Sequence, residues 1–349
     1  MNYQTVRDFP DHRTETAWRD LLSRLDLPSH YNAPEFFLEP FWAGRNPFAI
    51  LAYEGDSIAA VLTGIHQGEH VVCGLPSRPQ IAVDAKMNHD AALGVLVKGL
   101  LEEAGRAKTV SVYSWPSVEM SPFSGSGFRR RQLVGNVVLD LTLGADALFR
   151  EFAKDRRRNI RFAEKNGLTV RIATNREDFL RAYDVYIAWV DAKAAKAKGE
   201  RRTFEKFEAA QKLVNNRRLF VAELSGKVIA INTFRFYPGG LFESAANFSL
   251  DEFLHLKPND LLQWKGIEWA CNNGLRRHSL GGAHPFLTRF GGKIVPVVRY
   301  RADRTLLHQH DLREVIEDTV RSTVRRMPPK VQRRVRRALG KAGNEQKNR

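Results

Sequence analysis

Cysteine is scarce in this chain, and the two cysteines present, Cys73 and Cys271, do not form a C-x-x-C pair. This scarcity excludes a disulfide framework and predicts reduced, buried thiols in a cytoplasmic protein. Long apolar runs are also missing, and none approaches the roughly 18 residues of a membrane-spanning helix. The first residues, MNYQTVRDFPDHRTE, are charged and lack an apolar stretch, so no secretory signal is expected.

The composition is that of a folded protein with more than one domain. Apolar residues make up 43% of the 349 residues, and they include 21 Phe and 6 Trp. This content excludes a disordered or low-complexity chain. The length suits two domains of roughly 150 residues each.

The net charge of +16 is unevenly distributed along the chain. Residues 321–349 hold eleven Lys and Arg against one acid, Glu345, so this tail contributes +10 and the other 320 residues only +6. A second basic cluster lies at residues 154–165. Clustered positive charge attracts RNA, anionic lipid headgroups or phosphorylated substrates. The alternative is a solvated face and a solubilising tail.

Two segments spaced about 170 residues apart share one pattern of strands and turns. A repeat of this length is too long for a solenoid. Residues 47–75 and 219–247 each contain an apolar strand, a tight turn with Gly, an Ile-Ala strand and a second turn into a third strand. A helical segment ending in Gly follows each, at residues 90–105 and 260–274, and then a further strand. The pattern predicts two copies of one domain.

Antiparallel strands followed by a helix and a crossover strand predict a mixed α/β fold. We expect two tandem domains, each a mostly antiparallel mixed sheet flanked by helices. The expected limits are residues 1–145 and 146–305, followed by a helical basic tail over residues 306–349.

Two motifs then point to a known family. The run RRNIRFAEKNG at residues 157–167, followed by an apolar strand, resembles the Fem-like branch of the GNAT acyltransferase superfamily. The run LHLKPNDLLQWKGIEWACNNGLRRHSLGGA at residues 254–283 is similar to the family's Lys-Pro-Asn, helix, Gly, strand and Gly-Gly block. Phe290-Gly291-Gly292 resembles its closing Phe-Gly-Gly. The resemblance spans residues 36–301 and implies tandem GNAT-like domains that transfer an acyl or aminoacyl group to an amine.

Lys257 and Asn259 are candidate site residues because they open a helix. Pro258 suits its first turn, and Asn259 or Asp260 can cap it. Exposed N–H groups beside Lys257 would bind a phosphate or a developing oxyanion. An ordinary capped helix is the alternative interpretation.

Glu243 is the candidate general base, with Asn247 as a binding residue on the same strand. The resemblance places this strand where the GNAT sheet opens to admit an acyl donor. Burial that raises the pKa of Glu243 would let it accept a proton from an amine. A carboxylate that faces water is the alternative.

Four arginines are candidate contacts for an anionic substrate: Arg157, Arg158, Arg161 and Arg289. The Fem group usually carries Phe-Lys just before Phe-Gly-Gly, whereas Leu287 stands in the place of that lysine and Arg289 is its nearest replacement. The Arg/Gln-x-x-Gly-x-Gly loop for acetyl-CoA is missing at both helix starts. These departures leave the donor open between aminoacyl-tRNA and acyl-CoA.

No cofactor is firmly implied, and no metal is expected. His308-Gln309-His310 has the spacing of a metal pair, but no cysteine or clustered acid completes the site.

Three functions remain open. The first is Fem-like acyl or aminoacyl transfer to an amine on a peptidoglycan or other envelope precursor. The second is acyl-CoA-dependent N-acetyl transfer, and the third is RNA or membrane-surface binding without catalysis.

The expected partner is an anionic substrate, either tRNA, a nucleotide-sugar or a lipid-linked precursor. We expect a cytoplasmic monomer in peripheral contact with the inner face of an anionic membrane. The basic tail would make that contact, and it carries a thin apolar stripe of Val331, Val335 and Leu339 after Pro328-Pro329.

Overall fold

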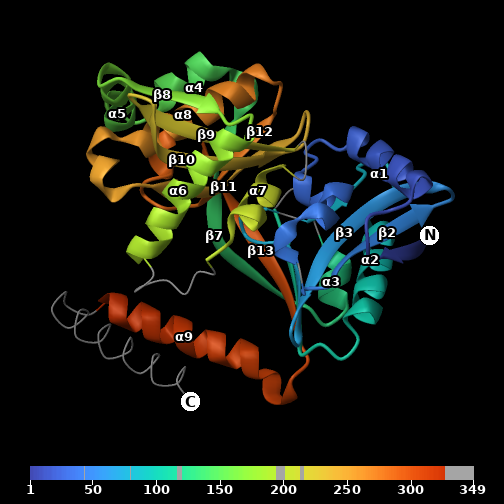
Figure 1. Ribbon diagram of the computed structural model, residues 1–349. Helices are drawn as coiled ribbons and strands as arrows, with labels where there is room; N and C mark the ends of the chain where they lie inside the picture. Colours follow the sequence, from blue (N-terminus) through green and yellow to red (C-terminus); the bar gives the residue numbers. More distant parts are fainter. Residues whose placement is uncertain (43, 79, 116–119, 194–200, 213–215, 327–349) are drawn as a thin grey trace.

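The computed structural model describes residues 1–42, 44–78, 80–115, 120–193, 201–212 and 216–326. One large mixed sheet runs through both halves of the chain, and helices cover its two faces (Figure 1). The predicted mixed α/β fold is therefore confirmed.

The N-terminal half contains seven strands and three α-helices within the described residues. The strands are β1 (Asn2–Val6), β2 (Pro47–Glu54), β3 (Ser57–Gln67), β4 (His70–Cys73), β5 (Ile81–Val83), β6 (Thr109–Ser114) and β7 (Arg129–Asp140). The helices are α1 (His12–Arg24), α2 (His89–Ala104) and α3 (Ser121–Gly125).

The C-terminal half contains six strands and six α-helices within the described residues. The strands are β8 (Leu168–Ile172), β9 (Arg217–Leu224), β10 (Lys227–Phe236), β11 (Leu241–Ser249), β12 (Arg277–Gly282) and β13 (Lys293–Asp303). The helices are α4 (Ala145–Glu151), α5 (Lys154–Lys165), α6 (Arg176–Lys193), α7 (Phe204–Lys212), α8 (Pro258–Asn272) and α9 (Gln309–Arg326).

The predicted duplication is visible in the topology of the two halves. In the first, β2, β3 and β4 form an antiparallel meander, and α2 crosses over to β6, which pairs in parallel with β4. In the second, β9, β10 and β11 form the meander, and α8 crosses over to β12, which pairs in parallel with β11. Gly55 and Gly226 have positive φ in the first turn of each meander, a conformation that glycine adopts without steric cost.

The two copies exchange their last strands. The order along the sheet is β1-β2-β3-β4-β6-β13-β7-β12-β11-β10-β9-β8, with β5 beside β3. Thus β13 pairs with β6 of the other copy, β7 pairs with β12, and the two exchanged strands pair with each other. The expected boundary at residue 145 falls at the start of α4, and it stays a prediction because the sheet passes through both halves.

Strands β2, β3, β9 and β10 are buried on both faces, which explains their nearly continuous apolar sequences. In β2, Ile50 belongs to the cluster with α2, whereas Leu51 belongs to the cluster with Trp18 of α1. In the second copy, Phe220 of β9 packs in the cluster with α8, and Val221 packs in the cluster with α6 and α7. Each sheet half is therefore the middle layer of three.

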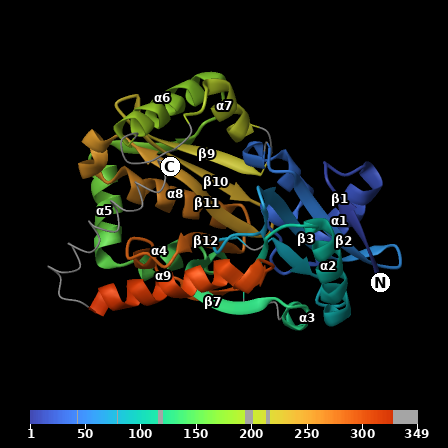
Figure 2. The ribbon, with the colours of Figure 1, turned by 90° about the horizontal axis from the view of Figure 1, so that it is seen from below.

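The C-terminal segment is helical up to the end of the described residues. The short 3-10 turn Leu306–His308 leads into α9, which lies along the underside of the molecule (Figure 2). The predicted stripe of Val331, Val335 and Leu339 lies outside the described residues. Among the residues that are described, no helix is both long and apolar enough to cross a bilayer.

Crossover helix α8 approaches the sheet so closely that one position requires glycine. A Cβ atom on Gly266 would lie 2.4 Å from the ring of Phe234. We expect Gly266→Ala to lower the free energy of unfolding by about 1–3 kcal/mol, the usual effect of overpacking a core.

The matched control is Gly94→Ala on α2, where an added Cβ would meet no atom within 4 Å. Alanine is the better helix former, so this change should stabilise by up to about 1 kcal/mol. Urea unfolding of both variants measures the difference, and a stabilised Gly266→Ala variant would contradict the close packing of α8.

Candidate functional site

The sheet of the C-terminal half opens where β11 and β12 part. These strands pair in parallel only from Leu241 to Glu243 and from Arg277 to Ser279, although β11 continues to Ser249. On its other side, β11 has a bulge against β10, in which Ala245 has no partner residue. An extra residue of this kind leaves the ladder locally unpaired and redirects the strand.

A central pocket of about 360 Å³ lies between the two halves of the protein. Its walls come from β3, β4 and the loops beside them on one side, and from α7, β10 and β11 on the other. Among its described lining residues are four arginines and no acid: Arg45, Arg78, Arg202 and Arg235. Five aromatic rings complete the wall: Tyr31, Phe41, Trp42, Phe207 and Phe248.

A second pocket of about 440 Å³ occupies the space where β11 and β12 diverge, next to α8. We call it the splayed-strand pocket. Its polar lining includes Asn232, Ser244 and Asn247, and its apolar lining includes Leu280 and Leu287. Ala245 and Ala246 line both pockets, so the bulge of β11 is their common wall.

Glu39 joins the two halves beneath the central pocket. Its carboxylate accepts a hydrogen bond of 2.8 Å from Nε of Arg235, and it lies 2.5 Å from Nη2 of Arg217 and 2.7 Å from Nε2 of His30. The side chains of Glu39, Arg217 and His30 are fully buried. Burial alone would raise the pKa of Glu39, but the charges of Arg235 and Arg217 hold it well below its usual range.

The pocket retains positive charge after this pairing. Arg78 donates to the hydroxyl of Tyr31, and its guanidinium lies 4.4 Å from the centre of that ring. Arg202 lies 4.3 Å from the ring centre of Phe41. Cationic groups held over aromatic rings beside a polar cavity suit a ligand that carries an anionic group.

Glu243 on β11 lies directly opposite Arg235 on β10 and Ser279 on β12, and it is not among the described residues that line either pocket. It is only 5% exposed. Burial raises the pKa of Glu243 to about 7, although the nearby charges of Arg78 and Arg235 act in the opposite direction. Glu243 is therefore buried, which excludes the alternative of a carboxylate facing water, and its role as a base stays a prediction.

Asn247 and Asn259 both line the splayed-strand pocket, and Lys257 lies at the start of α8 beside it. The expected side-chain cap of α8 is wrong. Lys257 is the N-cap residue in a left-handed conformation, no side chain caps the helix, and Asn259 instead accepts a hydrogen bond of 2.5 Å from Ser249. Pro258 is the first helical residue, as predicted.

The predicted arginine contacts lie away from both pockets. Arg158 and Arg161 are exposed on α5, Arg157 is half-buried there, and none of the three lines either pocket. Arg289 pairs with Asp155 at 2.6 Å. Their role in substrate binding stays a prediction.

Their neighbour Arg156 is the arginine of α5 that faces inward. It pairs with the buried Asp260 of α8 at 2.5 Å and lies 4.4 Å from the ring centre of Phe286. Helical spacing places Arg156 on the same face as Ile160 and Ala163, so the sequence contained this signal.

One group of side chains has a composition that could hold a cation. Asp303, His308 and Asp311 bring potential ligand atoms within 4.8 Å of one another. These groups also organise the start of α9, because Asp303 accepts hydrogen bonds from Thr305 and from the backbone N–H of Asp311. The expectation that no clustered acid accompanies His308 is therefore wrong, and none of these three residues is among the described residues that line either pocket.

The sequence patterns did not point to Glu39, Arg78 or Arg235. Arg235 carried a signal, because it is a charge in the apolar strand VIAINTFRF. A buried charge requires a partner. The partner, Glu39, lies 196 residues away, and no local pattern connects the two.

Comparison with known proteins agrees with this architecture. Residues 150–287 match a family model described as an acetyltransferase (GNAT) domain. No curated protein sequence matches the chain.

Three solved structures share the fold over most of the chain. FemX has a TM-score of 0.66 and 13% identity, covering 91% of this chain and 100% of its own. The C-terminal domain of a putative lysylphosphatidylglycerol synthetase from Agrobacterium fabrum has a TM-score of 0.60 and 16% identity. The match covers 88% of this chain and 95% of that domain. A tandem GNAT protein from the clavulanic acid biosynthesis pathway has a TM-score of 0.55 and 13% identity. The match covers 87% of this chain and 99% of that protein. The chain thus has the tandem GNAT fold that these three structures share.

The buried pairing of Glu39 should be essential for stability. Glu39→Gln leaves Arg217 and Arg235 buried without their counter-charge, so we expect the free energy of unfolding to fall by about 3–5 kcal/mol. Glu15→Gln is the control, because Glu15 pairs with Arg19 near the surface and its loss should cost at most about 1 kcal/mol. Equal losses in a denaturant titration would contradict the role of Glu39.

The raised pKa of Glu243 makes stability depend on pH in a defined direction. The fold favours the protonated carboxyl, so this residue reduces stability as pH rises from about 4.5 to about 7. Gln does not titrate. Glu243→Gln should therefore gain up to about 3 kcal/mol relative to the native chain between pH 5 and pH 8.

Urea unfolding at the two pH values measures this gain. Glu252→Gln, at an exposed position, is the control and should show none. If the difference between Glu243→Gln and the native chain did not change with pH, the assigned pKa would be wrong.

Proposed function

We propose that this protein is an N-acyltransferase of the Fem-like type, which transfers an acyl or aminoacyl group to an amine. One observation carries the proposal. The central pocket and the splayed-strand pocket share the bulge of β11 as a wall, and the buried Glu243 lies on the same strand two residues before that bulge. This arrangement suits an acceptor in one pocket and an activated donor in the other.

The chemistry requires few groups because the donor is already activated. The amine nitrogen of the acceptor attacks the carbonyl carbon of the donor ester or thioester. A C–N bond forms, the C–O or C–S bond breaks, and the leaving group departs with a proton. Glu243 takes the proton of the attacking amine, directly or through one water, and its pKa near 7 suits that task.

The negative charge on the carbonyl oxygen needs a hydrogen-bond donor in the transition state. Ala245 is the unpaired residue of the bulge and lines both pockets, so its backbone N–H is the nearest candidate. Lys257, at the start of α8, is the second candidate and would instead contact the phosphate or sugar part of the donor.

The arginines of the central pocket indicate an acceptor with an anionic group. Arg45, Arg78 and Arg235 can bind phosphate or carboxylate oxygens, and the aromatic wall can hold an apolar or ring-shaped part. A nucleotide-sugar or lipid-linked precursor with a free amine has both features. The basic face of α5 would then contact an anionic donor such as tRNA.

Two donor classes are candidates for this protein, and each appears in the name of a solved structure with this fold. Lysylphosphatidylglycerol synthetase is named for an aminoacyl product, and the tandem GNAT protein is named with reference to AcCoA. Isothermal titration of the purified protein with acetyl-CoA and with aminoacyl-tRNA separates the two classes. Binding of one donor without any transfer to amines would favour a protein that binds RNA or membranes and has lost catalysis.

We expect Glu243→Gln to lower kcat by about 10²–10⁴-fold, as typically follows loss of a general base, with little change in KM. The native enzyme should gain activity as pH rises through about 7, where Glu243 loses its proton, and the variant should lose this limb of the profile. Steady-state rates from pH 5.5 to 8.5 test both points. Glu252→Gln should retain the native profile, and a Glu243→Gln enzyme with native rates would exclude Glu243 as the base.

A further inference from the structure

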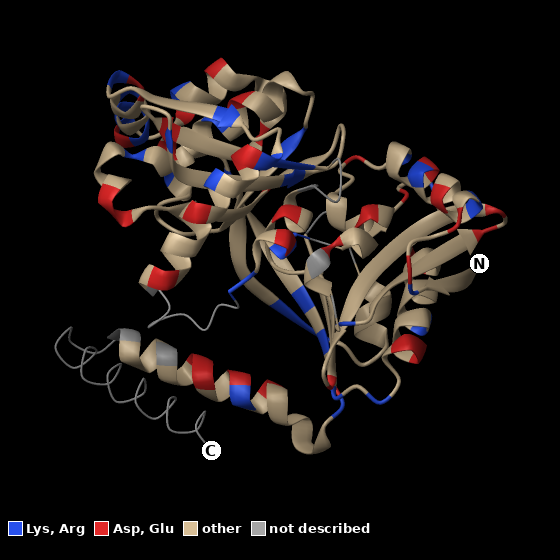
Figure 3. Ribbon diagram, in the orientation of Figure 1, with Lys and Arg blue, Asp and Glu red and all other residues tan. Residues whose placement is uncertain are grey.

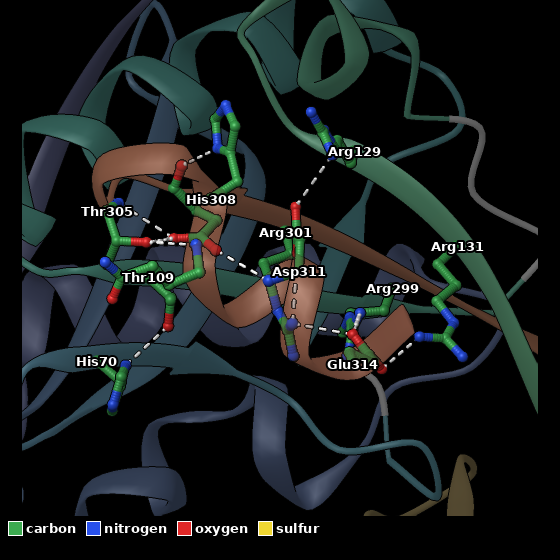
Figure 4. A network of polar contacts seen from close by, with 12 residues as sticks. His70, Thr109, Arg129, Arg131, Arg299, Arg301, Thr305, His308, Asp311 and Glu314 are labelled. Carbon is green, nitrogen blue, oxygen red and sulfur yellow. Dashed lines mark hydrogen bonds and ion pairs between the residues drawn. The ribbon is translucent and has the colours of Figure 1, made fainter. Parts of the chain in front are cut away.

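Helix α9 is attached to the sheet through charged side chains. Its residues Asp311 and Glu314 face the exchanged strands (Figure 4). Asp318 pairs with Arg131 of β7. Glu314 lies 2.5 Å from Nη2 of Arg299 and 2.9 Å from Nη1 of Arg301. These arginine contacts hold the pKa of Glu314 below its usual value, against the opposite effect of burial.

The opposite side of the same segment is apolar and faces solvent. Leu312, Ile316 and Val320 are spaced by four residues, which places them on one stripe of the helix. They are 56%, 54% and 40% exposed. Leu306 and Leu307, just before the helix, are each 79% exposed.

This distribution is the reverse of an ordinary surface helix, whose apolar stripe faces the core. Of the fifteen large apolar side chains that are exposed in the described residues, six lie between residues 306 and 320. Such a concentration marks an interaction surface. The two views agree that α9 lies at the periphery, with no other described helix below it (Figures 1 and 2).

We propose that the outer face of α9 binds an anionic lipid surface. The observation that selects this occupant is charge. The sequence turns strongly basic at the end of α9, with eleven Lys and Arg and a single acid over residues 321–349. An apolar helix face beside dense positive charge is typical of segments that lie in the interface of an anionic bilayer.

The acids of α9 do not oppose this contact. Asp311, Glu314 and Asp318 are neutralised by arginines of β7 and β13, and the more exposed Glu317 pairs with Arg313 at 3.1 Å. In Figure 3, basic segments of these strands lie above the helix and to the right of its acidic residues. The four acids of α9 are therefore all paired with arginines, and none of them adds an unpaired negative charge beside the apolar stripe.

The test uses the full chain and vesicles of phosphatidylglycerol mixed with phosphatidylcholine, compared with vesicles of phosphatidylcholine alone. We expect co-sedimentation with the anionic vesicles and at least ten-fold weaker binding to the neutral ones. The triple variant Leu312→Gln, Ile316→Gln and Val320→Gln should bind the anionic vesicles at least ten-fold more weakly than the native chain.

The control carries Val134→Gln and Leu143→Gln, which alter exposed apolar residues outside the segment. It should bind vesicles like the native chain, and both variants should keep the native unfolding temperature. Native vesicle binding by the triple variant overturns the proposal. The proposal is also overturned if the native chain sediments as a dimer and the triple variant as a monomer. In that case a second copy of the chain, and not lipid, would cover the stripe.

Two further measurements distinguish lipid binding from RNA binding and from the proposed transferase activity. The triple variant should bind RNA as tightly as the native chain does. If the variant loses RNA binding and vesicle binding in parallel, a role specific to lipid is overturned. Vesicle binding is measured without donor or acceptor, so failure of the proposed transferase activity does not affect its outcome.

Discussion

The carboxylate of Glu39 is the constraint on which the functional architecture depends. It is fully buried and bound by Arg217 and Arg235 of the other half, so a single negative charge holds the two halves and two cations together. Removing one partner of a buried pair leaves the other partners with their desolvation cost, so this network adds to the continuous sheet an energetic penalty for separating the two surfaces. The central pocket exists between surfaces that this network holds in place, and Arg235 extends the network from Glu39 towards Glu243.

Duplication gives the two halves the same topology but different tasks. Both copies contain a parallel strand pair joined by a crossover helix, β4 with β6 and β11 with β12. In the second copy, β11 continues past its partner and carries the bulge at Ala245, which opens a space on both sides of the strand. In the first copy, the residues after β4 contribute Gly74 and Arg78 to the wall of the central pocket. In the function we propose, the second copy provides the reacting strand, and both copies provide the binding wall.

The sequence predicts those features that depend on neighbouring residues. Strand alternation, glycine turns and the two crossover helices are local, and so the meanders and the duplication could be anticipated. Pairings between distant segments could not. The exchange of β7 and β13, and the contact between Glu39 and Arg235, depend on residues brought together only by the complete sheet. The predicted cap of α8 failed for a local reason: the helix begins at Pro258, so Lys257 is the N-cap residue, and a lysine side chain has no acceptor for the first N–H groups.

The strand exchange also explains why α9 exposes its apolar side. In the exchanged pair, Arg299 of β13 lies directly opposite Arg131 of β7, and Arg301 lies opposite Arg129. Like charges in directly opposite positions destabilise a sheet. Acids from another element must therefore cover these strands, and Asp311, Glu314 and Asp318 of α9 supply them. A helix with its acids committed to the sheet must turn its remaining apolar residues outward, so the join between the two copies creates the surface that we assign to lipid.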